Sequence, residues 1–162
     1  MSGTSRTKLR LGEVLVEAGQ ITELQLAQAL KLQKESPDNL RLGAVLVDNN
    51  FISEERLNAA LAQRLGIKYV SMSDAPIDID AVKRIPKSVA SKHCLIAIAI
   101  NHGNLLVNIN DPLDYYAIED IKLITGLHIE VQIYNRHEIL NAIHEAYSEI
   151  ETQAAASGAR PF

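Results

Sequence analysis

The feature that most constrains this chain is an internal repeat in its first half. Residues 10–16 read RLGEVLV, and residues 41–47, which lie 31 positions later, read RLGAVLV. The match continues beyond these segments, so that both copies follow the pattern RLGxVLVxxxxI[TS]ExxLxxAL. Agreement over so many positions at one offset indicates the duplication of a single supersecondary unit.

Each copy is predicted to form a short helix, a tight turn and a longer helix. In the first copy Gly19 ends the short helix, and Thr22 caps the longer one with Gln25 completing a capping box. The second copy has Asn50 in place of that glycine, and asparagine is the next residue most tolerant of the left-handed conformation. Ser53 then caps the second long helix. The first half should therefore be a four-helix subdomain.

The second half of the chain changes its period and predicts a mixture of helices and strands. A helix should follow Pro86, two strands should form a hairpin around His102 and Gly103, and an alternating apolar segment should form a further strand. We expect, in order, a helix at 88–92, strands at 94–100 and 105–109, a helix at 115–124, a strand at 128–134 and a helix from 135. This pattern predicts an α+β fold in which a small α/β subdomain with a three- or four-stranded sheet follows the helices.

The boundaries follow from these patterns. We predict the duplicated helical subdomain at residues 8–66, the α+β subdomain at 67–150, and a tail or linker at 151–162 that is rich in alanine. Apolar residues Ile139, Ile143, Ala146, Tyr147 and Ile150 share one face of the last helix and should be buried.

Composition excludes several classes of protein. With 47% hydrophobic residues the chain can bury a core, and its longest apolar run, 94–100, is too short for a membrane span of about 20 residues. The net charge is −4, with 8 basic and 8 acidic residues up to Gly66 and 8 against 12 beyond it, which argues against DNA or RNA as a partner. Cys94 has no other cysteine to pair with and is interpreted as a small buried residue in a strand. We expect a cytoplasmic protein.

The sequence contains no motif that indicates an enzyme. It has no GxxxxGK[ST] phosphate loop, so we do not expect ATPase activity from this chain. The segments that begin at His137 and His144 start like the zinc motif HExxH, but Asn141 and Ser148 stand where the second histidine belongs. We therefore expect no metal and no cofactor.

The two RLG segments with their following helices resemble the N-terminal domain of type II secretion and type IV pilus assembly ATPases, in its cyclic-di-GMP-receptor version, the MshEN domain. Residues 110–114, which read NDPLD, together with Asp120, Ile121, Thr125 and Gly126, are similar to the second subdomain of that family. The resemblance implies a regulatory domain that binds cyclic di-GMP, with the ATPase domain of the parent protein following residue 150. It also implies secretion or pilus platform proteins as partners, which would recruit the protein to the inner membrane without direct membrane insertion.

The same resemblance implies a set of ligand contacts. They are Lys8, Arg10, Leu11, Gly12, Leu26, Leu30 and Gln33 around the first motif, Arg41, Leu42, Gly43, Leu57, Leu61 and Arg64 from the second, and Asp111 from the later subdomain. Arg64 stands where the pattern has a closing glutamine, and the spacer between the copies is two residues longer than the pattern. The second half-site could therefore differ from the first.

Chemistry supports this reading, and other readings stay open. Arginine can bond guanine or phosphate through two N–H groups, and glycine lets a ligand approach the backbone. Asp111 could accept hydrogen bonds from guanine, although an aspartate before proline is more often a turn former. The arginines could simply begin helices, and the four leucines are core residues first. A protein-docking module that recruits such an ATPase to a platform protein without binding nucleotide is the main alternative, and a helix-turn-helix DNA binder fits the helices but not the charge.

Overall fold

A computed structural model describes residues 10–37, 40–70 and 76–157 of the chain. These residues form two compact units, Met1–Ile67 and Lys68–Phe162, which are treated separately below. Within the described ranges, no helix is both long enough and apolar enough to cross a lipid bilayer.

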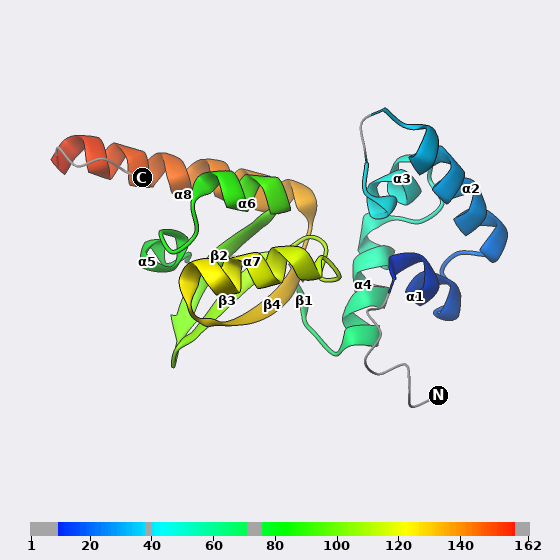
Figure 1. Cartoon of the computed structure of the whole chain (residues 1–162), viewed down its shortest axis with the longest axis horizontal. Coiled ribbons are helices and arrows are strands. Elements are labelled where there is room, and N and C mark those ends of the chain that lie inside the picture. Colours follow the sequence, from blue (N-terminus) through cyan, green and yellow to red (C-terminus); the bar gives the residue numbers. More distant parts are fainter. Residues whose placement is uncertain (1–9, 38–39, 71–75, 158–162) are drawn as a thin grey trace. The chain divides into compact units, whose positions relative to one another are not determined.

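The first unit consists of four helices: α1 (Leu11–Glu17), α2 (Glu23–Glu35), α3 (Leu42–Asp48) and α4 (Glu54–Leu65) (Figure 1). The predicted capping box is present, because the Gln25 amide donates to Thr22 Oγ1 at 3.1 Å and the Thr22 amide donates to Gln25 Oε1 at 2.9 Å. Ser53 accepts from the amide of Arg56. The turn residues Gly19 and Asn50 have φ values of 72° and 60°, so the asparagine adopts the same left-handed conformation as the glycine.

The two copies pack crosswise. The short helix α1 packs mainly on α4, and the short helix α3 packs mainly on α2, so each short helix lies against the long helix of the other copy. The helices α1 and α3 also contact each other. Aliphatic residues of all four helices and their turns form the core of this unit: Val14, Leu15, Ile21, Ala29, Val45, Leu46, Ile52, Leu57, Ala60 and Leu61. Exchanging one copy for the other reproduces the two main contacts, α1 with α4 and α2 with α3, and this indicates an approximate two-fold symmetry.

The second unit contains a four-stranded mixed sheet, as the α+β prediction required. Its strands are β1 (Tyr69–Val70), β2 (Leu95–Asn101), β3 (Asn104–Ile109) and β4 (His128–Tyr134), in the order β1-β4-β3-β2. Strands β2 and β3 form the predicted antiparallel hairpin, whose turn residues His102 and Gly103 have φ values of 52° and 81°. Strand β4 is parallel to β1 and to β3.

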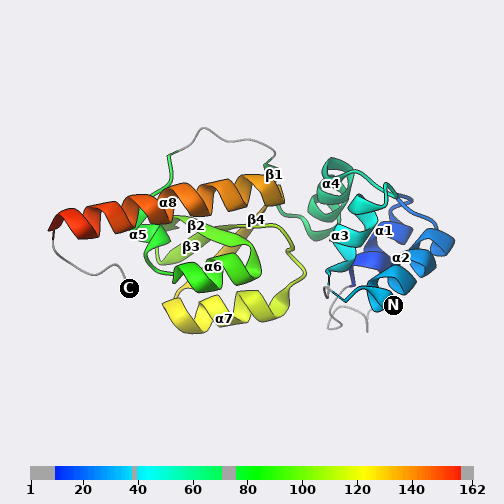
Figure 2. The ribbon, with the colours of Figure 1, turned by 90° about the horizontal axis from the view of Figure 1, so that it is seen from above.

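Four helices accompany this sheet: α5 (Ile79–Val82), α6 (Lys87–His93), α7 (Tyr115–Thr125) and α8 (Arg136–Ser157). Helices α5, α6 and α8 pack on β2, and α7, which connects β3 to β4, packs on β4 (Figure 2). The apolar face predicted for the last helix is buried, since Ile139, Ile143, Ala146, Tyr147 and Ile150 all belong to the core.

Some details differ from the predictions. Cys94 is not part of a strand; it is the left-handed residue, with φ 51°, that ends α6 just before β2 begins at Leu95. Helix α8 continues to Ser157, so residues 151–157 are helical where the composition predicted a tail or linker. The two-residue strand β1 and the single turn α5 were not predicted, because elements this short carry no periodic pattern.

Candidate functional site

The two RLG segments occupy the same structural position in the two copies. Arg10 is the residue that immediately precedes α1, and Arg41 immediately precedes α3, both with extended backbone conformation. Both arginine side chains are exposed, and neither makes a capping hydrogen bond to its own helix. The arginines therefore begin helices, as the simpler interpretation held. Their side chains also lie at the surface, where they could contact a ligand.

The two segments lie side by side. The Cδ2 methyl of Leu11 is 3.4 Å from the point that a Cβ atom on Gly43 would occupy, and the two residues belong to different copies. This contact agrees with the packing of α1 on α3. The structure therefore brings the two motifs together near the approximate two-fold axis of the first unit.

The glycine of each motif lies against a leucine of the long helix that follows it, Leu26 for Gly12 and Leu57 for Gly43. A Cβ atom on Gly12 would lie 2.5 Å from Leu26 Cδ1, which is too close for any side chain unless the leucine moves. A Cβ atom on Gly43 would lie 3.7 Å from Leu57 Cδ1, which is ordinary van der Waals contact. The close approach of α1 to α2 thus explains the glycine in the first copy more strongly than in the second.

The predicted leucines divide between core and surface. Leu57 and Leu61 of α4 are buried, as expected of core residues. Leu26 is half-buried and Leu30 is 46% exposed, so the expectation that all four are core residues is wrong for Leu30. Leu11 and Leu42, the first residues of α1 and α3, are half-buried.

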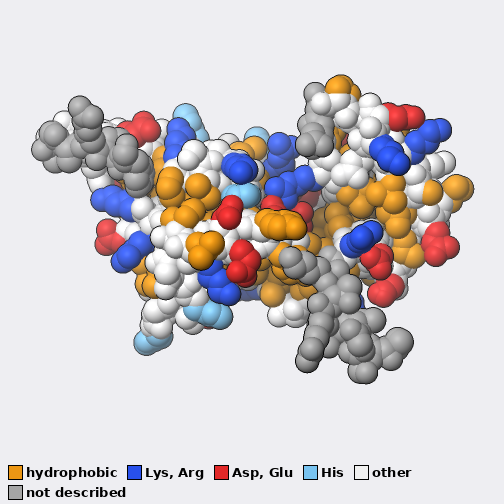
Figure 3. Space-filling model, in the orientation of Figure 1, with side chains coloured by type: hydrophobic (Ala, Val, Ile, Leu, Met, Phe, Trp, Pro, Cys, Tyr) orange, Lys and Arg blue, Asp and Glu red, His pale blue; other side chains and the backbone are white. Residues whose placement is uncertain are grey.

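The first unit has further exposed leucines that were not singled out from the sequence. Leu24 on α2 is 69% exposed, and Leu32 and Leu40 are also exposed. Figure 3 shows hydrophobic side chains gathered on one face of the first unit. The exposure of Leu24 and Leu32 could not be predicted from the helical period, because α2 has apolar residues on more than one side.

The residues that close the two motifs differ in their surroundings. Gln33 is half-buried, and its side-chain amide Nε2 donates to the backbone carbonyl of Leu40 at 2.9 Å. Arg64, at the matching position of α4, is an exposed residue in the last turn. Lys8 lies outside the described residues.

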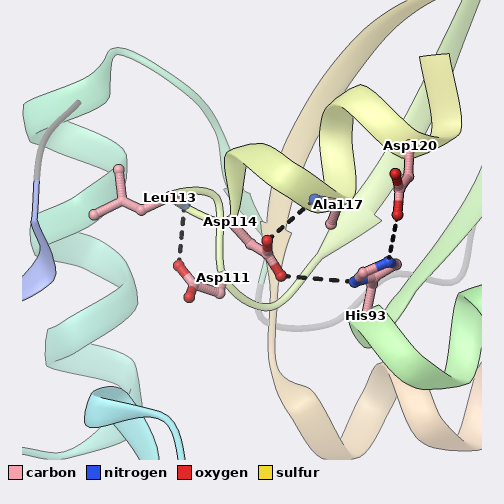
Figure 4. Close-up of polar contacts among 6 residues, drawn as sticks. All are labelled: His93, Asp111, Leu113, Asp114, Ala117 and Asp120. Carbon is pink, nitrogen blue, oxygen red and sulfur yellow. Dashed lines mark hydrogen bonds and ion pairs between the residues drawn. The ribbon is translucent and has the colours of Figure 1, made fainter. Parts of the chain in front are cut away.

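Asp111 belongs to the second unit. It is half-buried, its Oδ1 accepts from the amide of Leu113 at 3.0 Å, and its backbone carbonyl accepts from the amide of Asp114 at 3.1 Å (Figure 4). These bonds match the turn-forming reading of an aspartate before a proline. A ligand contact by Asp111 stays a prediction.

A buried histidine in the second unit was missed by the sequence reasoning. His93, only 8% exposed, has its Nε2 3.3 Å from Asp120 Oδ2 and its Nδ1 3.8 Å from Asp114 Oδ2 (Figure 4). Asp114 also caps α7 through the amide of Ala117. The histidine therefore joins the end of α6 to the first turns of α7, and the sequence gives no local signal for pairs 21 and 27 residues apart. Among the residues that the structure describes, no group of three or more His, Cys, Asp or Glu could hold a metal ion.

Comparison with known proteins places the chain in a family. The family model described as the MshEN domain matches residues 65–153, more than half of the chain. The type IV pilus assembly ATPase PilB of Myxococcus xanthus (strain DK1622) is 32% identical over 140 residues, which are 86% of this chain and 24% of that protein. Bacteriophage adsorption protein B of Escherichia coli (strain K12) is 28% identical over 148 residues, 91% of this chain and 20% of that protein. The chain thus spans a quarter or less of these relatives.

Two solved structures resemble the fold as well. The structure of MshE with cdg, the abbreviation of cyclic di-GMP, is 33% identical with a TM-score of 0.73, and the match covers 86% of this chain and 99% of that one. The N-terminal domain of XpsE is 26% identical with a TM-score of 0.67, over 83% of this chain and 92% of that one. These matches are too long to be confined to the second unit, so they include at least part of the helical unit that the family model mostly leaves out. The chain belongs to the MshEN domain family.

Proposed function

We propose that this chain is a cyclic-di-GMP-binding regulatory domain of a type II secretion or type IV pilus assembly ATPase, and that the paired RLG segments bind the ligand. The observation that carries the proposal is the contact of Leu11 with Gly43, which joins the two motifs across the approximate two-fold axis. Cyclic di-GMP has two identical halves. A two-fold surface can meet each half with an equivalent set of residues.

The chemistry of the exposed residues supports a guanine nucleotide. The side chains of Arg10 and Arg41 can each donate two parallel hydrogen bonds to guanine O6 and N7 or to a phosphate. Phe51 is the only aromatic residue among positions 1–67, so the first unit can offer little stacking on aromatic rings and apolar contact falls mainly to leucines. The half-buried Leu11 and Leu42 and the exposed Leu30 are the candidates for that contact.

The remaining residues of the proposed site follow from their places in the repeat. Gly43 is partly exposed and leaves the backbone beside Arg41 open to a ligand, whereas Gly12 is buried against Leu26 and allows α1 to pack closely on α2. Arg64 adds a third cation at the end of α4. Lys8 and Asp111 are retained as predicted contacts, and the similarity to MshE, whose structure is with cdg, is further support.

Calorimetric titration of the chain with cyclic di-GMP tests the proposal. Replacing Arg10 or Arg41 with alanine should weaken binding by about 1–3 kcal/mol, or about 5- to 150-fold, which is the worth of one two-pronged contact to guanine. Arg56→Ala provides a matched control, since Arg56 is an exposed arginine of α4 at a variable position of the repeat. GTP and cyclic di-AMP serve as ligand controls. Absence of heat at saturating cyclic di-GMP would contradict the proposal.

A second candidate function is docking to a platform protein without nucleotide binding. The observation that favours it is the outer face of α7, where Tyr116 is 79% exposed and Leu123 is 83% exposed. In this case Leu123→Asp should abolish capture of a platform protein. The double replacement of Arg10 and Arg41 by alanine should leave that capture intact, and no nucleotide should bind the unaltered chain.

A further inference from the structure

Helix α2 has two exposed leucines in one row. Leu24 is 69% exposed, Leu32 is 40% exposed, and Gln28 between them is exposed as well. Side chains four positions apart lie above one another on the same side of an α-helix. The three residues therefore form a continuous row on the surface, which we call the outer row of α2.

The outer row points away from the residues with which α2 packs in its own unit. Each residue turns an α-helix by about 100°, so side chains two positions apart point in nearly opposite directions. Leu26, whose methyl groups lie against Gly12 of α1, is two positions from Leu24 and from Gln28. Leu30, which is proposed above to bind ligand, is likewise two positions from members of the outer row. The outer row is therefore separate from the internal packing of α2 and from the proposed ligand site.

The second copy shows that the repeat folds without leucine in this row. Glu55, Ala59 and Gln63 of α4 match the outer row at the repeat offset of 31 residues, and all three are exposed. Glutamate and glutamine thus occupy the same structural positions as the two leucines of α2. Because folding of the repeat does not require these leucines and water disfavours them, a row of this kind indicates a contact surface.

The charges of α2 favour a second copy of the same helix as the partner. The first half of the helix carries Glu23 alone, and the second half carries Lys31, Lys34 and Glu35, so the two halves have net charges of −1 and +1. An antiparallel pair places each half beside the half of opposite charge and sets the two helix dipoles against each other. A parallel pair would place like charges together at both ends.

We propose that the outer row of α2 is a self-association surface, on which a second copy of this chain packs its own α2 antiparallel. Gln28 is the midpoint of the row, so it lies at the two-fold axis of the pair, and Leu24 of each chain packs on Leu32 of the other. With two leucines per chain the contact is smaller than a stable interface of about 1,200 Å², and we expect a dissociation constant of about 0.1–1 mM. This contact goes beyond the function proposed above and uses none of the residues assigned to the ligand there.

Sedimentation equilibrium of the chain between about 10 μM and 1 mM tests the association. The double variant Leu24→Glu/Leu32→Gln has the residues of α4 at the matching positions, so it should keep its fold, as circular dichroism checks. It should raise the dissociation constant at least about tenfold, because both leucine contacts are lost. Leu123→Gln, at an 83% exposed position of α7, is the control and should leave the constant unchanged.

A chain that stays monomeric at 1 mM, the upper end of the constant expected above, would overturn the proposal and leave the outer row to a different protein. An unchanged dissociation constant in the double variant would assign the association to another surface and overturn it equally.

Cysteine cross-linking tests the antiparallel geometry. In a Cys94→Ser background the introduced cysteine is the only one in the chain. Gln28→Cys should form disulfide-linked dimers under mild oxidation, because the two copies of this position meet at the axis. Glu35→Cys, two turns later on the same side of α2, should not, since its copies lie about 21 Å apart along the pair and a disulfide spans at most about 7 Å between Cα atoms.

Gln63→Cys, at the matching face of α4, measures cross-linking by random collision. Cross-linking of Gln28→Cys no faster than that of Gln63→Cys would contradict the proposed axis. Cross-linking of Glu35→Cys as fast as that of Gln28→Cys would indicate a parallel pair and overturn the antiparallel arrangement.

Discussion

The two units of this chain differ in the polar side chains that they bury. All five histidines and all five tyrosines lie beyond residue 67, and the first unit has a largely aliphatic core, which also buries Asn58, with its described arginines at the surface. The second unit buries Tyr147 and His93 and gives both of them partners. Tyr147, 1% exposed, donates its hydroxyl proton to the carbonyl of Ile85 at 2.6 Å, and His93 lies between two carboxylates.

This difference indicates which unit contains the residues that define the fold and which contains the residues proposed to bind the ligand. Buried polar groups with specific partners restrict the residues that can occupy a position, and the family model matches the second unit, where such groups lie. The residues proposed to bind ligand, apart from Asp111, lie in the first unit, which is a helical repeat with a largely aliphatic core. The residues that define the fold and those proposed to bind ligand are therefore largely separated along the chain.

The largest expected effect tests the core of the second unit. Leu105→Ala should lower the free energy of unfolding of this unit by about 2–5 kcal/mol, because Leu105 in β3 is fully buried and its removal leaves a cavity. The chain has no tryptophan and all tyrosines lie in this unit, so urea unfolding followed by tyrosine fluorescence reports on it alone. Leu123→Ala, at an 83% exposed position, should change stability by less than about 0.5 kcal/mol. Equal effects of the two replacements would contradict the assigned core.

The next prediction concerns alkaline pH and also separates the units. Burial raises the pKa of Tyr147 from 10.0 to about 12. The unfolded chain loses this proton near pH 10 while the folded chain keeps it, so stability present below pH 10 should be lost as the pH rises towards 12. The loss amounts to about 2–3 kcal/mol, given 1.36 kcal/mol for each unit of pKa.

The measurement compares unfolding free energies of the unaltered chain and of Tyr147→Phe between pH 9 and pH 12, the range set by the two pKa values above. The phenylalanine variant should be less stable at neutral pH by about 1 kcal/mol, the worth of the lost hydrogen bond, and should lack this part of the alkaline decline. Tyr116→Phe should keep the full decline, since Tyr116 is 79% exposed. A decline that is unchanged in Tyr147→Phe would assign it to other groups.

The smallest effect tests the first unit through its two glycines. Gly12→Ala should destabilise the first unit by about 1–2 kcal/mol, because the added methyl group would displace Leu26 and the gain in helix propensity offsets only part of that cost. Gly43→Ala should cause no loss, since its nearest neighbours are at ordinary contact distance. Thermal unfolding followed by far-ultraviolet circular dichroism measures both. Equal losses would show that the two copies are packed alike.

Much of the fold could be predicted because its signals are local. The caps at Thr22 and Ser53, the left-handed turn at Asn50 and the hairpin turn at Gly103 each depend on residues within a few positions of one another. The repeat was a second, independent reason to predict four helices in the first unit. Signals of this kind fix where elements begin and end.

What could not be predicted depends on contacts between distant residues. The exposure of Leu30, the bond from Gln33 to Leu40 and the pairing of His93 with Asp120 all require knowledge of how helices pack. The matching of α1 with α4 in place of α2 is of the same kind. The repeat identified the residues of the candidate site, but only the packing shows that the two RLG segments meet.

The crosswise packing also says something about how such a unit could arise. Since α1 and α3 each pack mainly on the other copy's long helix, a lone copy would leave the buried residues of its short helix without their main packing partner. Two separate peptides with this motif would cover those residues by dimerising, with a true rotation axis in place of the approximate one. The present chain has the architecture of such a dimer after gene fusion, in which covalent linkage frees each half to diverge.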